Sequence, residues 1–214
     1  MNYLMSGDGN KDKPKEGDDV WEYDPRIVDG KDSVAPYVPT PQSLVNTMLE
    51  MAGVGPGDIV YDLGCGDGRF LITAIQDYNA DKAVGYEITP YLAGIARENV
   101  AENGYSGRIT IENSNFMEAD YSEATLITIY LTTSGNAQLK PKFKKELKDG
   151  ARIISHDFPI TGWVMATEDN EPVRVGVHKV YYYTIPDAYT RKIETEQEET
   201  GDRWGRIKKL FDRL

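Results

Sequence analysis

The chain has 214 residues, a formal net charge of −11 and a single cysteine. This acidic balance argues against non-specific binding to DNA or RNA, which depends on Lys and Arg clustered at phosphates, and it is compatible with basic partners. No apolar run approaches the length of a membrane span, and the N-terminus lacks the basic and apolar regions of a signal peptide. One cysteine excludes an internal disulfide and suits a reducing compartment, so we expect a cytoplasmic protein without membrane contacts.

The chain divides by composition into three parts. Residues 1–33 are rich in Asp, Lys, Gly and Pro and hold few apolar positions, so we expect a disordered or loosely packed acidic segment. Residues 34–186 carry the periodic apolar patterns of a folded domain. Residues 187–214 have a charged helical pattern with one apolar face, and this helix is expected to dock on its own domain or on a partner.

Helical and strand-like patterns alternate along the domain. Thr40 is expected to cap the first helix, with Pro41 at its first position. In chain order, the patterns predict a helix from 41 to about 52, a strand at 58–63, a helix from about 70 to 75, a strand at 83–88, a helix at 90–103, strands at 108–112 and 124–131, a helix through 139–147, and strands at 151–155, 173–177 and 180–185.

Strands that alternate with helices indicate a doubly wound α/β fold with a mostly parallel sheet and right-handed crossovers. The last two of the seven predicted strands follow one another without a helix, so they are expected to form an antiparallel edge. In open sheets of this kind, ligands bind outside the carboxyl ends of the strands.

A glycine-rich turn follows the first predicted strand. Asp62 stands near the strand end, and Gly64, Gly66 and Gly68 follow in G-x-G-x-G spacing. Glycine tolerates positive φ and has no Cβ, so backbone can pass close to a bound nucleoside. The dinucleotide fingerprint needs G-x-G-x-x-G, and position 69 is Arg. The turn instead resembles the S-adenosylmethionine (SAM) loop of class I methyltransferases. Cys65 within it is expected to pack as a small residue under the cofactor.

Two further segments are expected to complete the nucleoside site. Glu87 ends the second strand about twenty residues beyond the glycines, where a βαβ unit places a carboxylate for ribose hydroxyls. Asn115 and Phe116 follow the third strand, where an amide can pair with the adenine edge and a ring can stack on the base, with Ile88 on the other face. The structural alternatives are a solvated strand-end acid for Glu87 and a turn residue for Asn115.

The segment before the first helix is expected to fold over the methionine end of the cofactor. Tyr37 and Thr40 are its candidate binding residues. Thr40 either serves only as the helix cap or also holds the cofactor carboxylate, and both possibilities stay open at this point.

Residues 34–186 resemble, in particular, the archaeal protein lysine methyltransferases of broad specificity. This resemblance implies a seven-stranded Rossmann-like methyltransferase sheet, SAM as cofactor, and protein substrates with exposed lysines, with no direct contact to nucleic acid. The family usually has Asn where Ser134 stands, whereas Asn136 is in the matching place. The segments that carry the resemblance are 37–41, 60–69, 83–88, 115–116, 118, 120, 122–125, 139–141, 145–147, 155–156 and 162–163.

The segment after the fourth strand is where the methyl group is expected to meet its acceptor. Tyr130, Thr132, Thr133 and Asn136 are the candidates for orienting an acceptor amine by hydrogen bonds, with ordinary loop capping as the alternative. A lysine must be neutral to accept a methyl group, and burial beside a sulfonium lowers its pKa from about 10.4. A strong base on the enzyme is therefore not required.

Two other functions stay open at this point. A small-molecule N- or O-methyltransferase shares this fold, but such enzymes generally carry a lid, and no long inserted segment is evident. A non-catalytic SAM-binding or partner-docking module is the other alternative, and Asp62, the three glycines and Glu87 argue against it.

No metal site is expected from the spacing of the potential ligands. His156 and Asp157 are adjacent, but His178 is distant in the sequence, and the set lacks the ligand density of a recognisable site. Asp157 could instead act as a base for a hydroxyl acceptor.

Overall fold

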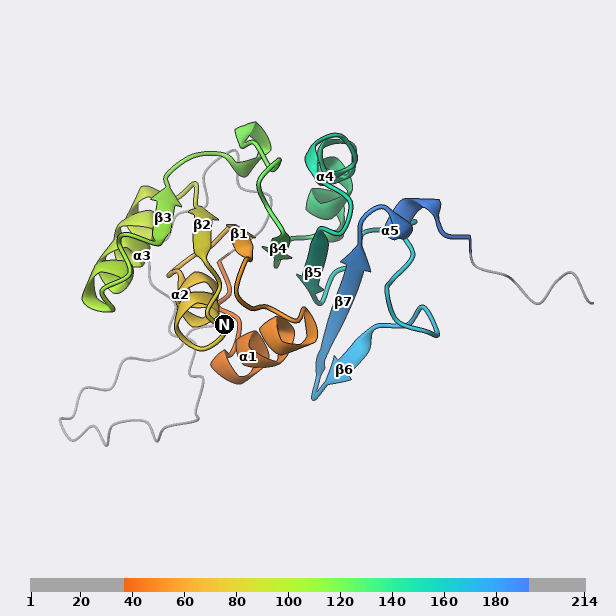
Figure 1. Cartoon of the computed structure of the whole chain (residues 1–214), viewed down its shortest axis with the longest axis horizontal. Helices are drawn as coiled ribbons and strands as arrows, with labels where there is room; N and C mark the ends of the chain where they lie inside the picture. Colours follow the sequence, from red (N-terminus) through yellow and green to blue (C-terminus); the bar gives the residue numbers. More distant parts are fainter. Residues whose placement is uncertain (1–36, 193–214) are drawn as a thin grey trace, which may run out of the picture.

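The structure is a computed structural model in which residues 37–192 are described (Figure 1). The predictions for residues 1–33 and for the apolar helical face beyond residue 192 lie outside this part of the chain. A seven-stranded sheet of order β3-β2-β1-β4-β5-β7-β6 forms the centre of the molecule. Its strands are β1 (Ile59–Leu63), β2 (Lys82–Tyr86), β3 (Ile109–Glu112), β4 (Leu126–Ile129), β5 (Arg152–His156), β6 (Val173–Val175) and β7 (His178–Thr184).

Strands β1 to β5 are parallel, and β7 and β6 complete the sheet by antiparallel pairing. The predicted doubly wound α/β fold with an antiparallel edge is therefore confirmed. Strand order reverses beside β1, so β1 and β4 start the two halves of the sheet. In such folds this reversal marks the place where ligands bind.

Helices cover both faces of the sheet (Figure 1). α1 (Gln42–Met51), α2 (Arg69–Gln76) and α3 (Pro90–Glu102) bury their apolar stripes in one core cluster, while α4 (Thr133–Glu146) and α5 (Asp187–Thr190) contribute to the other. Because both faces are covered, successive strand residues such as Val60 and Tyr61 are both buried, on opposite sides. This explains why the strands appear in the sequence as nearly continuous apolar runs.

Two helix starts differ from the sequence-based prediction. Pro41 rather than Thr40 is the N-cap of α1, and no side chain caps it. Helix α4 starts at Thr133, well before the predicted stripe, because the Thr132 hydroxyl accepts a hydrogen bond from the Gly135 amide at 3.1 Å. Such a cap offsets the low helix propensity of the polar residues that follow it.

The packed chain continues past residue 186, where the domain was expected to end. Ala188 of α5 is buried, and the Tyr189 ring lies 5.4 Å from the ring of Trp163. Among the helices of residues 37–192, none is both long and apolar enough to cross a bilayer.

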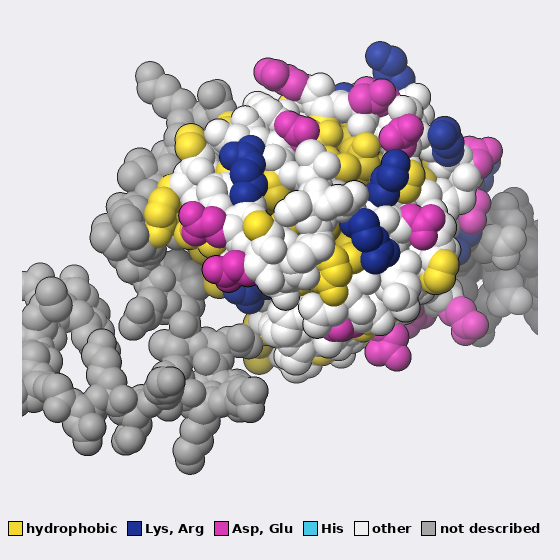
Figure 2. Space-filling model, turned by 60° about the vertical axis from the view of Figure 1, so that its left-hand side comes forward, with side chains coloured by type: hydrophobic (Ala, Val, Ile, Leu, Met, Phe, Trp, Pro, Cys, Tyr) yellow, Lys and Arg dark blue, Asp and Glu magenta, His cyan; other side chains and the backbone are white. Residues whose placement is uncertain are grey.

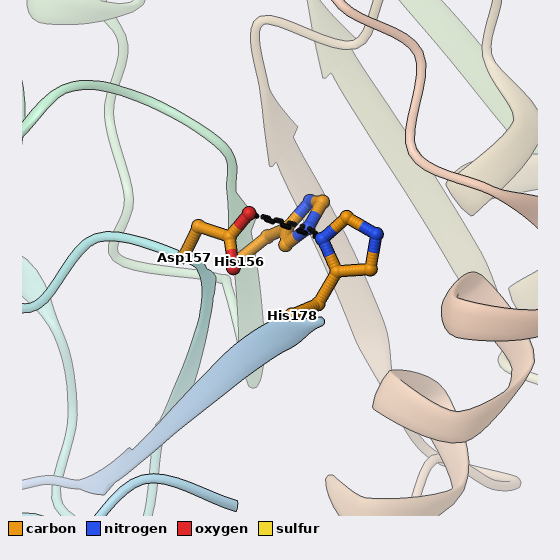
Figure 3. A group of neighbouring side chains, drawn as sticks. All are labelled: His156, Asp157 and His178. Carbon is orange, nitrogen blue, oxygen red and sulfur yellow. Dashed lines mark hydrogen bonds and ion pairs between the residues drawn. The ribbon is translucent and has the colours of Figure 1, made fainter. Parts of the chain in front are cut away.

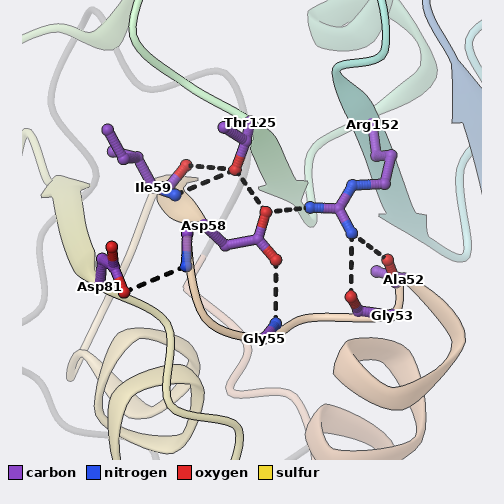
Figure 4. Close-up of polar contacts among 9 residues, drawn as sticks. Ala52, Gly53, Gly55, Asp58, Ile59, Asp81, Thr125 and Arg152 are labelled. Carbon is purple, nitrogen blue, oxygen red and sulfur yellow. Dashed lines mark hydrogen bonds and ion pairs between the residues drawn. The ribbon is translucent and has the colours of Figure 1, made fainter.

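A polar network ties the amino-terminal ends of the central strands together (Figure 4). Asp58, just before β1, forms an ion pair with Arg152 of β5 and accepts a hydrogen bond from the Thr125 hydroxyl at 2.6 Å. Its other oxygen accepts from the Gly55 amide at 2.9 Å. Arg152 in turn donates to the carbonyl of Ala52 at the end of α1. The charge of Asp58 is therefore compensated by contacts within the chain.

Candidate functional site

The glycine turn between β1 and α2 has the backbone shape that its sequence predicted. Gly64, Gly66 and Gly68 all have positive φ, of 88°, 53° and 84°. A Cβ on Gly66 would lie 2.5 Å from Cε2 of Tyr37, so the Tyr37 ring rests directly on the turn. Burial, reinforced by nearby Asp67, raises the pKa of Tyr37 to about 12, so the phenol stays protonated. The segment before α1 thus lies against the glycine turn.

Asp62 lies on β1 just before the turn and is 5% exposed. Its Oδ1 accepts a hydrogen bond from the Thr128 hydroxyl of β4 at 2.7 Å. Burial raises the pKa of Asp62 to about 7; the Thr128 hydrogen bond opposes this rise, and the nearby acids Asp67 and Glu87 add to it. A cationic ligand beside Asp62 would favour its ionised form.

Glu87 follows β2 directly and is 6% exposed, so it is not the solvated strand-end acid of the alternative interpretation. Its Oε2 accepts from the Gly66 amide at 3.0 Å and its Oε1 from the Thr89 amide at 2.8 Å. Burial raises the pKa of Glu87. Each carboxylate oxygen has two acceptor positions, so both oxygens retain capacity for ligand hydroxyls.

Cys65 is a small buried residue within the turn. A Cβ on Gly85 of β2 would lie 2.6 Å from the Cys65 sulfur, so the absence of a side chain at position 85 makes room for the thiol. Burial raises the pKa of Cys65 well above its usual value, which keeps it a thiol and disfavours a nucleophilic role. The sequence analysis assigned no packing role to Gly85. A glycine within a strand indicates that some other group approaches the backbone closely, but it does not say which group.

Asn115 and Phe116 follow β3, where Asn115 is the N-cap and Phe116 the first residue of a short 3₁₀ helix, η1 (Phe116–Glu118). The Asn115 side chain accepts a hydrogen bond from the Met117 amide at 2.9 Å, which is the turn role of the alternative interpretation. Asn113, which the sequence analysis did not single out, donates to the carbonyls of Glu87 and Ile88 at 2.9 and 3.1 Å. It joins the ends of β2 and β3, so Glu87, Ile88 and the start of η1 belong to one local structure.

The four candidates for orienting the acceptor lie in different environments. Tyr130 is half-buried, with its ring centroid 3.8 Å from the His156 ring. Thr132 caps α4 and also contacts the exposed Ser134 hydroxyl at 3.0 Å, while Thr133 is exposed at the first position of the helix. Thr132 thus has the capping role of the alternative, and Tyr130 and Thr133 remain candidates for contact with an acceptor.

Asn136 is fully buried and faces the chain after β5. Its Nδ2 donates to the Phe158 carbonyl at 2.9 Å and to the Ser155 hydroxyl at 3.3 Å, while Oδ1 has no hydrogen-bond partner within residues 37–192. The amide nitrogen is used to hold the segment after β5 against α4. Asn136 is therefore a positioning residue for that segment.

The two histidines and Asp157 come together at the carboxyl end of β5 (Figure 3). Antiparallel pairing of β5 with β7 removes the distance that the sequence suggested, so the spacing argument against a metal site does not hold in space.

Thr40 connects this cluster to the glycine turn. Its hydroxyl lies 3.1 Å from Nδ1 of His156, and its carbonyl accepts a hydrogen bond from Arg69 Nη1 at 2.7 Å. Arg69 also forms an ion pair with Asp67 at 2.7 Å. These contacts join the segment before α1, the glycine turn and the histidine cluster into one polar region at the carboxyl ends of the strands. The sequence analysis assigned no contact of this kind to Arg69, Asn113 or Thr128, because each depends on a partner from a distant segment.

Comparisons with known proteins agree with this geometry. The model of the ANTKMT methyltransferase domain matches residues 62–167. A protein-lysine N-methyltransferase of Saccharolobus islandicus is 51% identical over 154 residues, which are 70% of this chain and 93% of that protein. The mouse adenine nucleotide translocase lysine N-methyltransferase is 31% identical, over 70% of this chain and 63% of that protein.

A solved structure shares both fold and sequence with this chain. It is described as an RNA methyltransferase from Salinibacter ruber in complex with S-adenosyl-L-homocysteine. Its TM-score is 0.67 at 38% identity, and the match covers 74% of this chain and 100% of that one. The glycine turn and its acids thus belong to a fold that binds the product form of SAM.

Proposed function

Because the chain belongs to the protein-lysine N-methyltransferase family, we propose that it transfers methyl groups to lysine side chains of proteins. It is a SAM-dependent methyltransferase. The observation that carries the lysine acceptor is the 51% identity to the archaeal relative, which extends over nearly all of that protein. The single buried thiol of Cys65 supports a reducing, cytoplasmic location.

The acids around the glycine turn suit a cationic cofactor. Asp62 and Glu87 are both buried, both have raised pKa values, and Asp67 lies close to them. Ionised carboxylates in such surroundings are stabilised by a positive ligand. When bound, SAM supplies that positive charge together with a methyl group activated by its sulfonium.

The residues assigned to the cofactor follow from their places around the turn. We assign Glu87 to the ribose hydroxyls, Phe116 and Ile88 to the adenine faces, and Tyr37 and Thr40 to the methionine end. Asn115 uses its side-chain oxygen to cap η1, so its contribution to the adenine edge would come from the amide nitrogen. Gly64, Gly66 and Gly68 are assigned to the cofactor through the turn that they form: their positive φ shapes it, and the missing Cβ of Gly66 makes room for the Tyr37 ring.

The acceptor side of the site requires orientation rather than a strong base. Tyr130 and Thr133 are the candidates for contacting the amine, and Asn136 holds the segment that lies behind Tyr130. A lysine amine that enters a partly buried site loses hydration, which favours its neutral form. Holding that amine in line with the methyl group then lowers the barrier, by an amount on the order of several kcal/mol.

RNA is the second candidate acceptor, because the Salinibacter structure bears that description. Against it stands the net charge of −11, since RNA binding depends on clustered Lys and Arg. Figure 2 shows basic side chains interspersed with acidic ones on the face that it presents, without an extended basic patch there. The same charge supports basic proteins as the preferred substrates.

The test is methyl transfer from radiolabelled SAM by the full-length chain, offered small basic proteins in one reaction and structured RNA in another. We expect label on lysine side chains, located by mass mapping. Glu87→Gln should reduce transfer by more than about 100-fold, because it removes a charged acceptor from the cofactor site. Glu112→Gln is the matched control, since Glu112 is an exposed acid at the end of the neighbouring β3.

SAM binding with label in RNA alone would overturn the lysine proposal in favour of the second candidate. SAM binding without label in either polymer would point to a small-molecule acceptor.

A further inference from the structure

Both histidines of the 214-residue chain lie in one cluster with Asp157 (Figure 3). His156 is the last residue of β5, Asp157 follows it, and His178 begins β7. The antiparallel register sets His156 opposite Val180, and the Asp157 amide donates to the Lys179 carbonyl at 2.7 Å. The backbone of the two strands therefore places the three side chains together.

The three facing atoms form a nearly equilateral triangle. His156 Nε2 lies 2.9 Å from His178 Nδ1, His178 Nδ1 lies 3.1 Å from Asp157 Oδ2, and Asp157 Oδ2 lies 3.2 Å from His156 Nε2. Neighbouring ligands of a divalent ion with bonds of about 2.1 Å are separated by about 3.0 Å in octahedral and about 3.4 Å in tetrahedral coordination. The observed edges of 2.9, 3.1 and 3.2 Å lie close to the octahedral value and are shorter than the tetrahedral one.

The remaining polar atoms of two of the ligands are already held. Asp157 Oδ1 accepts a hydrogen bond from the Lys179 amide at 2.7 Å, which leaves Oδ2 for the shared position. His156 Nδ1 lies 3.1 Å from the Thr40 hydroxyl. A histidine ligand usually donates its second ring N–H to such an oxygen, which directs the lone pair of the other nitrogen toward the metal. When His156 carries its proton on Nδ1, its Nε2 and the Asp157 Oδ2 are two hydrogen-bond acceptors 3.2 Å apart. A cation bound between them stabilises both lone pairs.

The site is closed on one side and open on the other. The His156 side chain is 1% exposed, whereas those of Asp157 and His178 are each 28% exposed. An ion can therefore enter past Asp157 and His178, and water can complete its coordination there.

From this geometry we infer that His156, Asp157 and His178 bind one divalent first-row transition-metal ion, with Zn²⁺ as the best match to two imidazoles and a carboxylate. This replaces the expectation, based on sequence spacing, that no metal site is present. The bound ion joins the end of β5 to the β6–β7 hairpin. Because the Tyr130 ring packs against the His156 ring and the Thr40 hydroxyl lies within hydrogen-bond distance of His156, the ion also stabilises the acceptor side of the cofactor site.

The experiment is metal binding by the full-length chain prepared without a polyhistidine tag. Chelation and dialysis first remove any bound metal. Zn²⁺ is then added, and the number of bound ions per chain is measured by elemental mass spectrometry. Ring ¹⁵N resonances are recorded in parallel, and since the chain has two histidines, both sets of signals report on this site alone. We expect one ion per chain and shifts in both rings.

Variants separate this site from adventitious binding. His178→Ala and Asp157→Asn should each weaken Zn²⁺ binding by more than about 100-fold, and Thr40→Val by about 10-fold, as for an outer-shell partner. Glu168→Gln is the matched control, because Glu168 is an exposed acid in the connection between β5 and β6. It should leave the Zn²⁺ affinity unchanged. Circular dichroism of each variant confirms that it is folded.

Two results would overturn the inference. The first is the absence of stoichiometric Zn²⁺ binding at micromolar concentrations by the unmodified chain, with ring resonances unchanged, which would leave a hydrogen-bonded trio. The second is unchanged Zn²⁺ affinity in the folded His178→Ala and Asp157→Asn variants. Both readouts are independent of methyl transfer, so failure of the metal site and failure of the lysine acceptor are distinguishable.

Discussion

Asp58 and Asp62 lie at opposite ends of β1, and their carboxylates have different charged neighbours. Asp58 has an ion pair with Arg152 and hydrogen bonds from Thr125 and Gly55, so its charge is compensated within the protein (Figure 4). Asp62 is more deeply buried and receives a hydrogen bond from Thr128, and its charged neighbours in the described chain are acids.

The difference indicates which end of the sheet is structural and which end binds ligand. A buried carboxylate without a cation is costly, and folded proteins tolerate it mainly where function requires it. At the amino-terminal end, the compensating charge comes from β5. At the carboxyl end, we expect it to come from the cofactor.

The largest effect of a single substitution on stability is expected from breaking the pair at the amino-terminal end. Arg152→Met leaves Asp58 without its cation and should lower the free energy of unfolding by about 3 kcal/mol, the lower part of the range for partly buried pairs. Chemical denaturation with urea at pH 8 measures it. Asp62→Asn should not destabilise the ligand-free protein under the same conditions, because it removes an uncompensated charge. Equal destabilisation by Arg152→Met and Asp62→Asn would contradict the contrast between a compensated charge at Asp58 and an uncompensated one at Asp62.

The pH dependence of stability should show the same contrast. The pKa of Asp62 is raised by burial to about 7, above its unfolded value of 3.8, so the folded protein holds the proton more tightly. Stability should therefore fall as pH rises from about 4 to 7, by up to about 4 kcal/mol from this group. Glu87, whose pKa is also raised, contributes in the same direction.

The measurement is urea unfolding of the ligand-free protein and of Asp62→Asn across that pH interval. The difference in unfolding free energy between the two should change with pH and level off above about pH 7. A constant difference would show that Asp62 stays ionised throughout.

Cofactor affinity should respond to Asp62 in a pH-dependent way. A cationic ligand favours the ionised carboxylate, so SAM affinity should rise as pH increases through about 7. Asp62→Asn should weaken SAM binding by about 10- to 100-fold, as for the loss of a charged hydrogen-bonding partner, and should flatten this rise. Isothermal titration calorimetry from pH 6 to 8 measures both, and tight, pH-independent binding by the variant would contradict the assignment.

The smallest effect is expected at the glycine turn itself. Gly66→Ala forces a left-handed residue and places a Cβ against Tyr37, so it should cost about 1–2 kcal/mol of stability and weaken SAM binding. Gly104→Ala is the matched control, because Gly104 also has positive φ but no atom within 4 Å of its added Cβ. Thermal unfolding should show a loss in both variants, and only Gly66→Ala should bind SAM more weakly.

Much of the cofactor side was predictable because its signals are local in the chain. An apolar run followed by Gly64, Gly66 and Gly68 encodes a strand and a turn of positive φ within a few residues, and Glu87 lies one βαβ unit further on. The helix at α4 was predicted too short, because its first turn is polar and depends on the Thr132 cap. Asn136 was placed in a loop, whereas it lies on the buried side of that first turn.

The amino-acid pattern alone thus established the α/β fold, the order of its elements and the SAM-binding turn, since periodicity and backbone preference are properties of consecutive residues. Only the tertiary structure brought Thr40 to His156 across 116 positions and His178 to His156 across 22. Such meetings depend on strand order and pairing register, which arise from packing of the whole sheet. The difference between Asp58 and Asp62 has the same origin, because the partner of each carboxylate comes from a different strand.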